Sequence, residues 1–342
     1  MTGREQMPPD QVSAAPGVIR ESGLYFQVSA VLLALCALLA ALLLAGAHRD
    51  RPWDAMAFAA SPALALTGLI NWDLLAVAAM AGAMWAWARG RPVLAGALVG
   101  LGAATKLYPL FLLGALLVVC LRRGRPRPFL LALAAAVVAW VLANAPAVLL
   151  SLEQWKVFWS FNSERGADLG SIWLVLQQAG HQVSPETINL VSWVFFASVC
   201  VGVLALGLLA PRAPRIASLA FLVVAGFLLV NKVYSPQYVL WLLPLAVLAR
   251  PRWRDLVIWQ AGEVFYFAAV WLYLGGYTAP AGEGMPDRVY WLAILVRLAC
   301  EVYLMAVVLR DVVAPWRDPV RADGLVDDPM WPPPTVGAAG PR

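Results

Sequence analysis

The chain has 342 residues, of which 62% are hydrophobic and only 13% are charged, and its mean hydropathy is +0.74. This composition excludes an ordinary soluble domain and is typical of a protein that crosses a membrane many times. The formal net charge of +5 does not indicate nucleic acid as a partner, because the basic residues lie in short runs between apolar segments.

The first 23 residues are polar and contain three prolines, so they do not resemble a signal peptide. The apolar run that follows, Ser22 to Ala47, is longer than the hydrophobic region of such a peptide and predicts a first membrane helix. Two further charge-free runs, 128–152 and 187–211, are also long enough to span a membrane.

Arginine-bearing loops separate the apolar segments and set the predicted orientation. Because basic residues concentrate in the short cytoplasmic loops of membrane proteins, we expect five such loops in the cytoplasm. The loops contain Arg49 and Arg51; Arg89 and Arg91; Arg122, Arg123, Arg125 and Arg127; Arg212 and Arg215; and Arg250, Arg252 and Arg254. The prediction is an all-α polytopic protein with about 11 membrane passes, with residues 1–23 outside and the carboxyl terminus in the cytoplasm.

Between consecutive cytoplasmic loops the chain must cross the membrane and come back. This predicts hairpins whose outward apices contain Asp73, Lys106 and Lys232. Arms of about 14 to 18 residues, or about 21 to 27 Å of helix, are shorter than a full membrane core. We therefore expect the apices to be sunken and to face a water-lined cavity, because ionisable groups at this depth are usually functional. The predicted hairpins are 54–88, 92–121 and 216–249.

Two regions differ from this pattern of spans and hairpins. One lies within the predicted transmembrane domain, 24–312, and the other follows that domain. The outer loop 148–187 contains aromatic residues at helical spacing, which is typical of a helix in the membrane interface. The proline-rich segment 313–342 is expected to be a disordered cytoplasmic tail. The aromatic residues are Trp155, Phe158, Trp159 and Phe161.

Lysine is rare in this chain, and none of the three lysines lies in a predicted cytoplasmic loop. Two of them recur in similar stretches, Lys106 in "TKLYP" and Lys232 in "NKVYSP". An ammonium beside tyrosine, serine and amide groups in a wet hollow suits an anion, and at the outer leaflet the available anion is a lipid-linked phosphate. The alternative is that each lysine snorkels and marks the end of a helix.

Acidic residues in the apolar segments have competing interpretations. Asp73 is a candidate general base or a partner for a lysine, but we favour a helix cap made together with Asn71. Arg297 and Glu301 are four residues apart and predict an ion pair within one helix. Glu263 has no evident partner in the sequence and is a candidate cavity residue.

Four stretches in this order carry a family resemblance: "NWDLLAVA", "AGALVGLGAATKLYPLFLL", "FNSERGADLGSIW" and "NKVYSPQYVLWLLPL". They resemble the actinobacterial members of glycosyltransferase family 87, which are polytopic enzymes of the GT-C class. The similarity extends over most of residues 24–312.

The resemblance implies transfer of a hexose, mannose or a related sugar, from a polyprenyl phosphate donor to a lipid or glycolipid acceptor. The reaction would invert the anomeric carbon at the outer face of a bacterial plasma membrane, without a cofactor or metal. Membrane lipids, but no nucleic acid, are the other expected partners. By this resemblance the donor phosphate site is lined by Lys106, Tyr108, Lys232, Tyr234, Gln237 and Tyr238, and Arg165 lies near the sugar or the phosphate.

The resemblance also implies a catalytic aspartate in an external loop upstream of the matched motifs. We therefore expect an amino-terminal helix and its loop to be missing from this sequence, which would leave the chain inactive alone. Within the chain, Asp73 is the candidate for this role. A transporter or flippase of a lipid-linked or anionic substrate is the alternative, since polar apices in broken helices also build transport sites.

Overall fold

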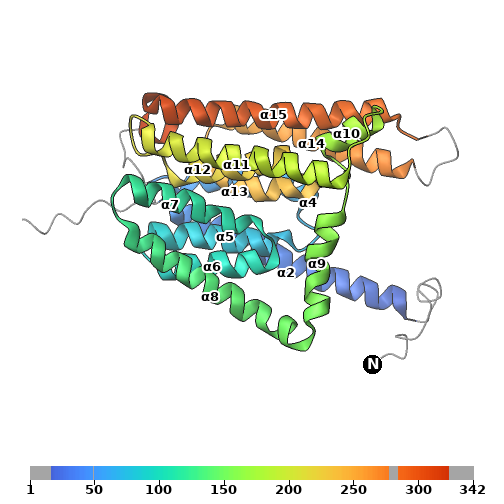
Figure 1. The fold of residues 1–342 in the computed structure, drawn as a ribbon, viewed down its shortest axis with the longest axis horizontal. Helices are drawn as coiled ribbons and strands as arrows, with labels where there is room; N and C mark the ends of the chain where they lie inside the picture. The colour runs from blue at the N-terminus through green and yellow to red at the C-terminus, as the bar shows by residue number, and fades with distance from the viewer. Residues whose placement is uncertain (1–16, 49, 277–283, 323–342) are drawn as a thin grey trace, which may run out of the picture.

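The structure is a computed structural model that describes residues 17–48, 50–276 and 284–322, and in these ranges the chain forms helices and loops (Figure 1). Within these described ranges, five helices are long and apolar enough to cross a membrane, which confirms a polytopic membrane protein. The three long runs predicted from the sequence are among them. The five are α2 (Val18–Ala47), α8 (Pro126–Leu150), α11 (Pro185–Leu209), α14 (Trp253–Gly275) and α15 (Asp287–Val313).

Five shorter apolar helices correspond to the predicted hairpin arms. Two of them, α5 with 16 residues and α6 with 14, are about 21 to 24 Å long, so these arms are indeed shorter than a membrane core. In the second and third hairpins, the arm that follows the apex begins with a 3-10 turn. The arms are α5 (Asp73–Ala88), α6 (Pro92–Thr105), η3 (Tyr108–Phe111) with α7 (Leu112–Arg122), α12 (Ile216–Leu229), and η4 (Pro236–Tyr238) with α13 (Val239–Ala249).

The first arm of the first hairpin is broken into pieces, where we expected one helical arm of about 14 to 18 residues. Pro62 has no amide hydrogen to donate and occupies the first turn of a new helix. The side chain of Ser61 caps this helix by accepting a hydrogen bond from the amide of Leu64 (3.2 Å). The arm therefore consists of three short pieces, η2 (Pro52–Ala55), α3 (Met56–Ala59) and α4 (Pro62–Thr67).

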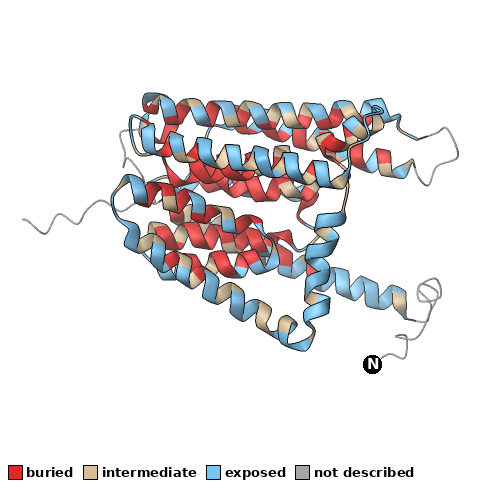
Figure 2. Cartoon of the chain, viewed as in Figure 1, coloured by how far each residue is buried: buried red, intermediate tan, exposed pale blue. Residues whose placement is uncertain are grey.

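The short arms form the centre of the bundle and the long helices surround them (Figures 1 and 2). Every residue of α13 is buried, and most of α5 and α12 is buried as well. By contrast, only 6% of the most apolar stretch of α8 and 11% of that of α11 are buried inside the protein. Apolar side chains that face outward on these helices are suited to contact with lipid.

Small residues allow α6 and α8 to pack closely. A Cβ atom added to Gly96 would lie 2.0 Å from the carbonyl oxygen of Ala132, and one added to Gly100 would lie 2.2 Å from that of Ala136. These distances are far below van der Waals contact, so the two backbones touch at both glycines. These two glycine contacts form a seam between α6 and α8. The seam fixes the distance between the two helices and with it the position of the apex after α6.

Hydrogen bonds gather the arginine-bearing loops at one end of the bundle. Arg89, after α5, donates to the carbonyl oxygen of Gly46 near the end of α2 (3.1 Å). Arg122, at the end of α7, donates to the carbonyl oxygen of Ala210 after α11 (2.9 Å). The loops thus share one end, as the charge pattern predicts, and the apices lie at the other end.

The chain after α15 is docked at the arginine end, although we expected disorder from residue 313 onward. Asp318 pairs with Arg215 (2.7 Å), and both side chains are buried. Arg215 also donates to the carbonyl oxygen of Leu248 (2.6 Å), which ties the segment to α13. The docked pieces are η5 (Pro315–Arg317) and α16 (Pro319–Ala322). Residues 323–342 lie outside the described residues.

Two helices lie in the predicted outer loop. One of them, α9 (Leu152–Glu164), has no buried residue and crosses the end of the bundle beside α8 and α11 (Figure 1). The helix itself is confirmed, and its location in the membrane interface stays a prediction. The second, α10 (Ile172–Gln178), packs against α15 and buries Trp173 and Val175.

Candidate functional site

A row of aromatic rings crosses the end of the bundle where the apices meet. The ring of Tyr108 on η3 stacks on Trp241 of α13 (centroids 4.8 Å apart, interplanar angle 7°). Trp241 in turn stacks on Tyr238 (4.0 Å), which lies 6.3 Å from Tyr234. Gln237, beside them on η4, is also buried. The structure thus brings four of the predicted binding residues into one cluster.

Asp73 and Lys106 form an ion pair at this cluster. The ammonium of Lys106 lies 2.9 Å from Oδ1 of Asp73, whose side chain is fully buried, and Trp241 donates to Oδ2 (3.3 Å). The predicted helix cap is half wrong, because Asn71 accepts the hydrogen bond from the amide of Asp73 (3.0 Å) while the Asp73 carboxylate turns inward. The structure therefore shows another of the roles considered for Asp73, which is to pair with a lysine.

Tyr234 is held by a second buried ionic cluster. Its hydroxyl donates to Glu301 (3.0 Å), and the guanidinium of Arg297 lies 3.4 Å from the centroid of its ring. Arg297 pairs with Glu263 on α14 (2.8 Å) rather than with Glu301 on its own helix, so the predicted intrahelical pair is wrong. The reason is that α14 and α15 pack along each other, which brings Glu263 within reach of Arg297.

Lys232 faces a neutral partner. Its ammonium donates to the amide oxygen of Asn189 on α11 (2.7 Å). Burial lowers the pKa of Lys232, and the nearby charge of Arg165 lowers this pKa further. The guanidinium of Arg165 is held by the carboxylate of Asp168 (2.9 Å). The side chains of Lys232, Arg165 and Asp168 thus form one corner of the site. Two cations and one carboxylate leave this corner with a surplus of positive charge.

Backbone hydrogen bonds join this corner to the apex. The amide of Asp168 donates to the carbonyl oxygen of Lys232 (2.8 Å), and the amide of Tyr234 donates to that of Leu169 (3.0 Å). Gly170 follows with φ +78°, and a Cβ there would lie 2.2 Å from the carbonyl oxygen of Tyr234. Only glycine suits this combination of a left-handed backbone and close approach. The loop before α10 and the apex after α12 therefore form one unit.

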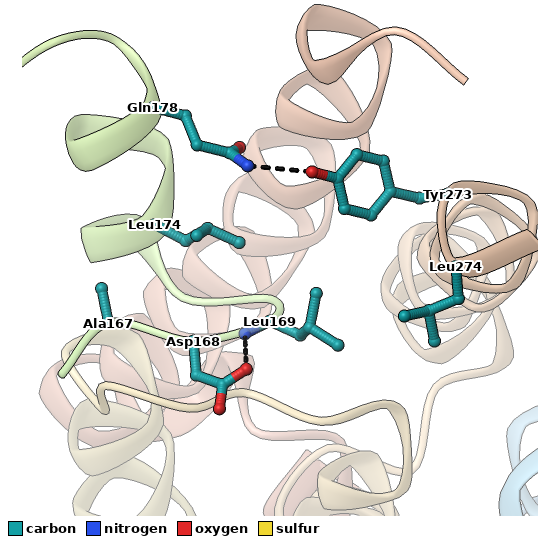
Figure 3. A pocket seen from close by; sticks show the side chains of 7 residues that line it. All are labelled: Ala167, Asp168, Leu169, Leu174, Gln178, Tyr273 and Leu274. Atoms are coloured by element: carbon teal, nitrogen blue, oxygen red, sulfur yellow. Dashed lines mark hydrogen bonds between the residues drawn. The ribbon is translucent and has the colours of Figure 1, made fainter. Parts of the chain in front are cut away.

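A cavity of about 280 Å³ opens beside this unit (Figure 3). Figure 3 shows α10 on one side and the end of α14 on the other. In the upper part of Figure 3, Gln178 of α10 donates to the hydroxyl of Tyr273 (2.9 Å). Trp291 donates to the side-chain oxygen of Gln178 (2.7 Å). The lining residues are Ala167, Asp168, Leu169, Leu174, Gln178, Tyr273 and Leu274.

Several residues of this site were missed by the sequence analysis. Asp168 carries a usable signal, because it lies three residues after Arg165. Trp241 looks like one more apolar residue of its helix until its indole nitrogen is placed beside Asp73. Gln178 stands among ordinary polar residues of the outer loop, and Asn189 lies at the start of the predicted span 187–211; nothing in the sequence distinguishes either residue.

Comparison with known proteins identifies the family. The sequence matches the model of Glycosyltransferase family 87 over residues 17–231, which is more than half of the chain. The match runs from the start of α2 to the apex after α12 and so includes both Asp73 and Arg165. No curated protein and no solved structure matches the chain. The chain therefore belongs to glycosyltransferase family 87.

Proposed function

We propose that this membrane glycosyltransferase moves a hexose, mannose in the first instance, from a polyprenyl phosphate donor to a lipid or glycolipid acceptor at the outer face of the plasma membrane. The observation that carries the proposal is the corner at Lys232 and Arg165, where two cations face one carboxylate. A donor phosphate would complete the charge balance there. Phosphate oxygens also accept the charge-assisted hydrogen bonds that lysine and arginine offer.

In the proposed reaction the acceptor oxygen bonds to the anomeric carbon of the sugar on the face opposite the phosphate. The bond between that carbon and the phosphate oxygen breaks, and the lipid phosphate leaves with the electron pair. Lys232 and Arg165 stabilise the charge that develops on the phosphate, which is where fixed cations lower a barrier most. The acceptor proton passes to a carboxylate, for which Asp73 is the candidate within this chain.

The two predicted lysines have different proposed roles. Lys232 would bind phosphate directly because its protein partner is a neutral amide. Lys106 is already neutralised by Asp73, so it would orient that carboxylate and the aromatic row rather than supply a free charge. Tyr238 lies within electrostatic reach of both Asp73 and Arg165, and it therefore links the two halves of the proposed site.

The direct test is sugar transfer by the full chain in lipid nanodiscs with radiolabelled polyprenyl phosphate mannose. We expect Lys232→Ala to lower the transfer rate about 100-fold, the size of effect seen when one stabilising donor is removed from a developing anion. Lys156→Ala is the matched control, because this exposed lysine lies 3.6 Å from Glu153 on α9, away from the corner. A properly inserted Lys232→Ala protein that transfers as fast as the control contradicts the proposal.

A further inference from the structure

We infer that the cavity between α10 and α14 binds the sugar ring of the lipid-linked donor. This inference rests on the proposed function, because it places the sugar next to the proposed phosphate corner. Asp168 belongs to both places: it lines the cavity and its carboxylate holds Arg165. In a sugar phosphate the ring is attached directly to the phosphate, so the two groups need adjoining sites.

The volume of the cavity suits one ring. At about 280 Å³ it is slightly smaller than the usual range of small-molecule sites, which is about 300 to 1,000 Å³. A polyprenyl chain or an oligosaccharide is too large for it. The cavity is therefore matched to a single monosaccharide unit.

The charge of the lining favours a neutral ligand. Among the described residues that line the cavity there is one carboxylate, Asp168, and no lysine or arginine. Because Asp168 is paired with Arg165, the lining offers a phosphate no free cation, whereas Lys232 and Arg165 lie at the adjoining corner. A sugar is neutral and carries many hydroxyl groups, so it can use the carboxylate as an acceptor.

The polar groups of the cavity are held in place before any ligand arrives. The amide of Gln178 is oriented by two contacts, one to the hydroxyl of Tyr273 (2.9 Å) and one from Trp291 (2.7 Å). Tyr273 in turn donates to Asp287 (3.0 Å). Within the described part of the chain, these bonds use one amide hydrogen of Gln178 and leave the other for a ligand hydroxyl. Such fixed groups recognise hydroxyls without an added cost of ordering.

The apolar part of the lining is equally suited to a ring. Leu169, Leu174 and Leu274 line the cavity between the polar groups. The C–H faces of a pyranose are apolar, while its hydroxyls project around the edge. A cavity with leucines and separate polar groups therefore matches both kinds of surface on one sugar.

The test compares two probes that bind to the full chain in nanodiscs, polyprenyl methyl phosphate and polyprenyl phosphate mannose, which are both phosphodiesters with one negative charge. In the parent protein we expect the sugar to tighten binding about tenfold or more, as measured by displacement of a fluorescent polyprenyl phosphate. Leu174→Phe and Ala167→Leu each add side-chain volume to the cavity. Both variants should lose this tenfold gain and still bind the sugar-free lipid as the parent does.

Leu176→Phe is the matched control, because Leu176 lies on the same helix with its side chain exposed and outside the cavity lining. The Leu176→Phe variant should keep the full gain in affinity that the sugar gives in the parent. If both filled variants keep the gain, or if the sugar adds no affinity in the parent, the sugar site is wrong while the phosphate corner stands. If neither probe binds the parent, both the proposed function and this inference are overturned.

Discussion

Two lysines in nearly the same local sequence have different surroundings. Lys106 lies 2.9 Å from a fully buried carboxylate, whereas Lys232 contacts a neutral amide and lies near a second cation. A lysine without a charged partner, with its pKa lowered by burial and by Arg165, holds its proton less firmly than a free lysine does. At the scale of a single residue, this makes Lys232 a group whose charge depends on pH.

We expect phosphate binding by the parent chain to weaken as the pH rises. The pKa of Lys232 is lowered, so Lys232 loses its charge as the pH rises through a value below the 10.5 of a free lysine. Lys232→Arg keeps its charge over this range, because arginine does not deprotonate in proteins. Binding of polyprenyl phosphate, measured between about pH 7 and pH 10.5, should therefore fall in the parent and stay level in the variant. If binding falls equally with pH in the parent and in the variant, the titration of Lys232 does not cause the pH dependence.

At the scale of elements, short arms between long helices place the polar apices. The arms α5 and α6 have 16 and 14 residues, and each packs against a long helix, α5 against α2 and α6 against α8. The arms stay in register because α6 packs on α8 through glycines. The position of Lys106, directly after α6, depends on this seam.

The glycine seam gives a stability prediction. Gly96→Ala adds a methyl group 2.0 Å from a backbone oxygen, so the two helices must separate, and such overpacking costs about 1 to 3 kcal/mol. Thermal unfolding in detergent should occur at a lower temperature for this variant than for the parent.

The matched control for the seam is Gly114→Ala in α7. No atom lies within 4 Å of the added Cβ there, and alanine favours a helix over glycine by about 1 kcal/mol. This control should unfold at or above the parent temperature. Equal unfolding temperatures for the two variants would contradict close packing at the seam.

At the scale of the whole molecule, the two ends of the bundle use charge differently. At one end, arginines are tied to carbonyl oxygens and aspartates, as in the buried pair of Arg215 and Asp318. At the other end, Lys232 and Arg165 keep a surplus of positive charge. The first arrangement stabilises the fold, and the second is the proposed phosphate site.

The docked segment after α15 gives a prediction for this scale. Asp318→Ala removes the carboxylate from buried Arg215, and breaking a buried ion pair in this way costs about 3 to 5 kcal/mol. We expect a lower unfolding temperature and faster proteolysis after residue 313. Glu153→Ala serves as the control, since the pair of Glu153 with Lys156 is exposed and such pairs contribute about 0 to 1 kcal/mol. If both variants resemble the parent, the segment does not depend on Arg215.

The sequence by itself determined the class of the fold and the grouping of its loops. Long apolar runs predict spans because membrane insertion depends on hydrophobicity summed along the chain, and arginine-rich loops share one end because the spans alternate in direction. It also indicated which apices hold ionisable groups, and residues 17–231 were sufficient to show the family.

Only the tertiary structure decided which charges are neutralised. Glu263, the partner of Arg297, is 34 residues away, and the nearer candidate in the sequence, Glu301, binds Tyr234 instead. Lys106 and Lys232 share a motif, yet one meets a carboxylate and the other an amide. Such pairings depend on how helices pack side by side, which local pattern does not encode. The cavity beside Asp168 likewise exists only where α10 and α14 meet.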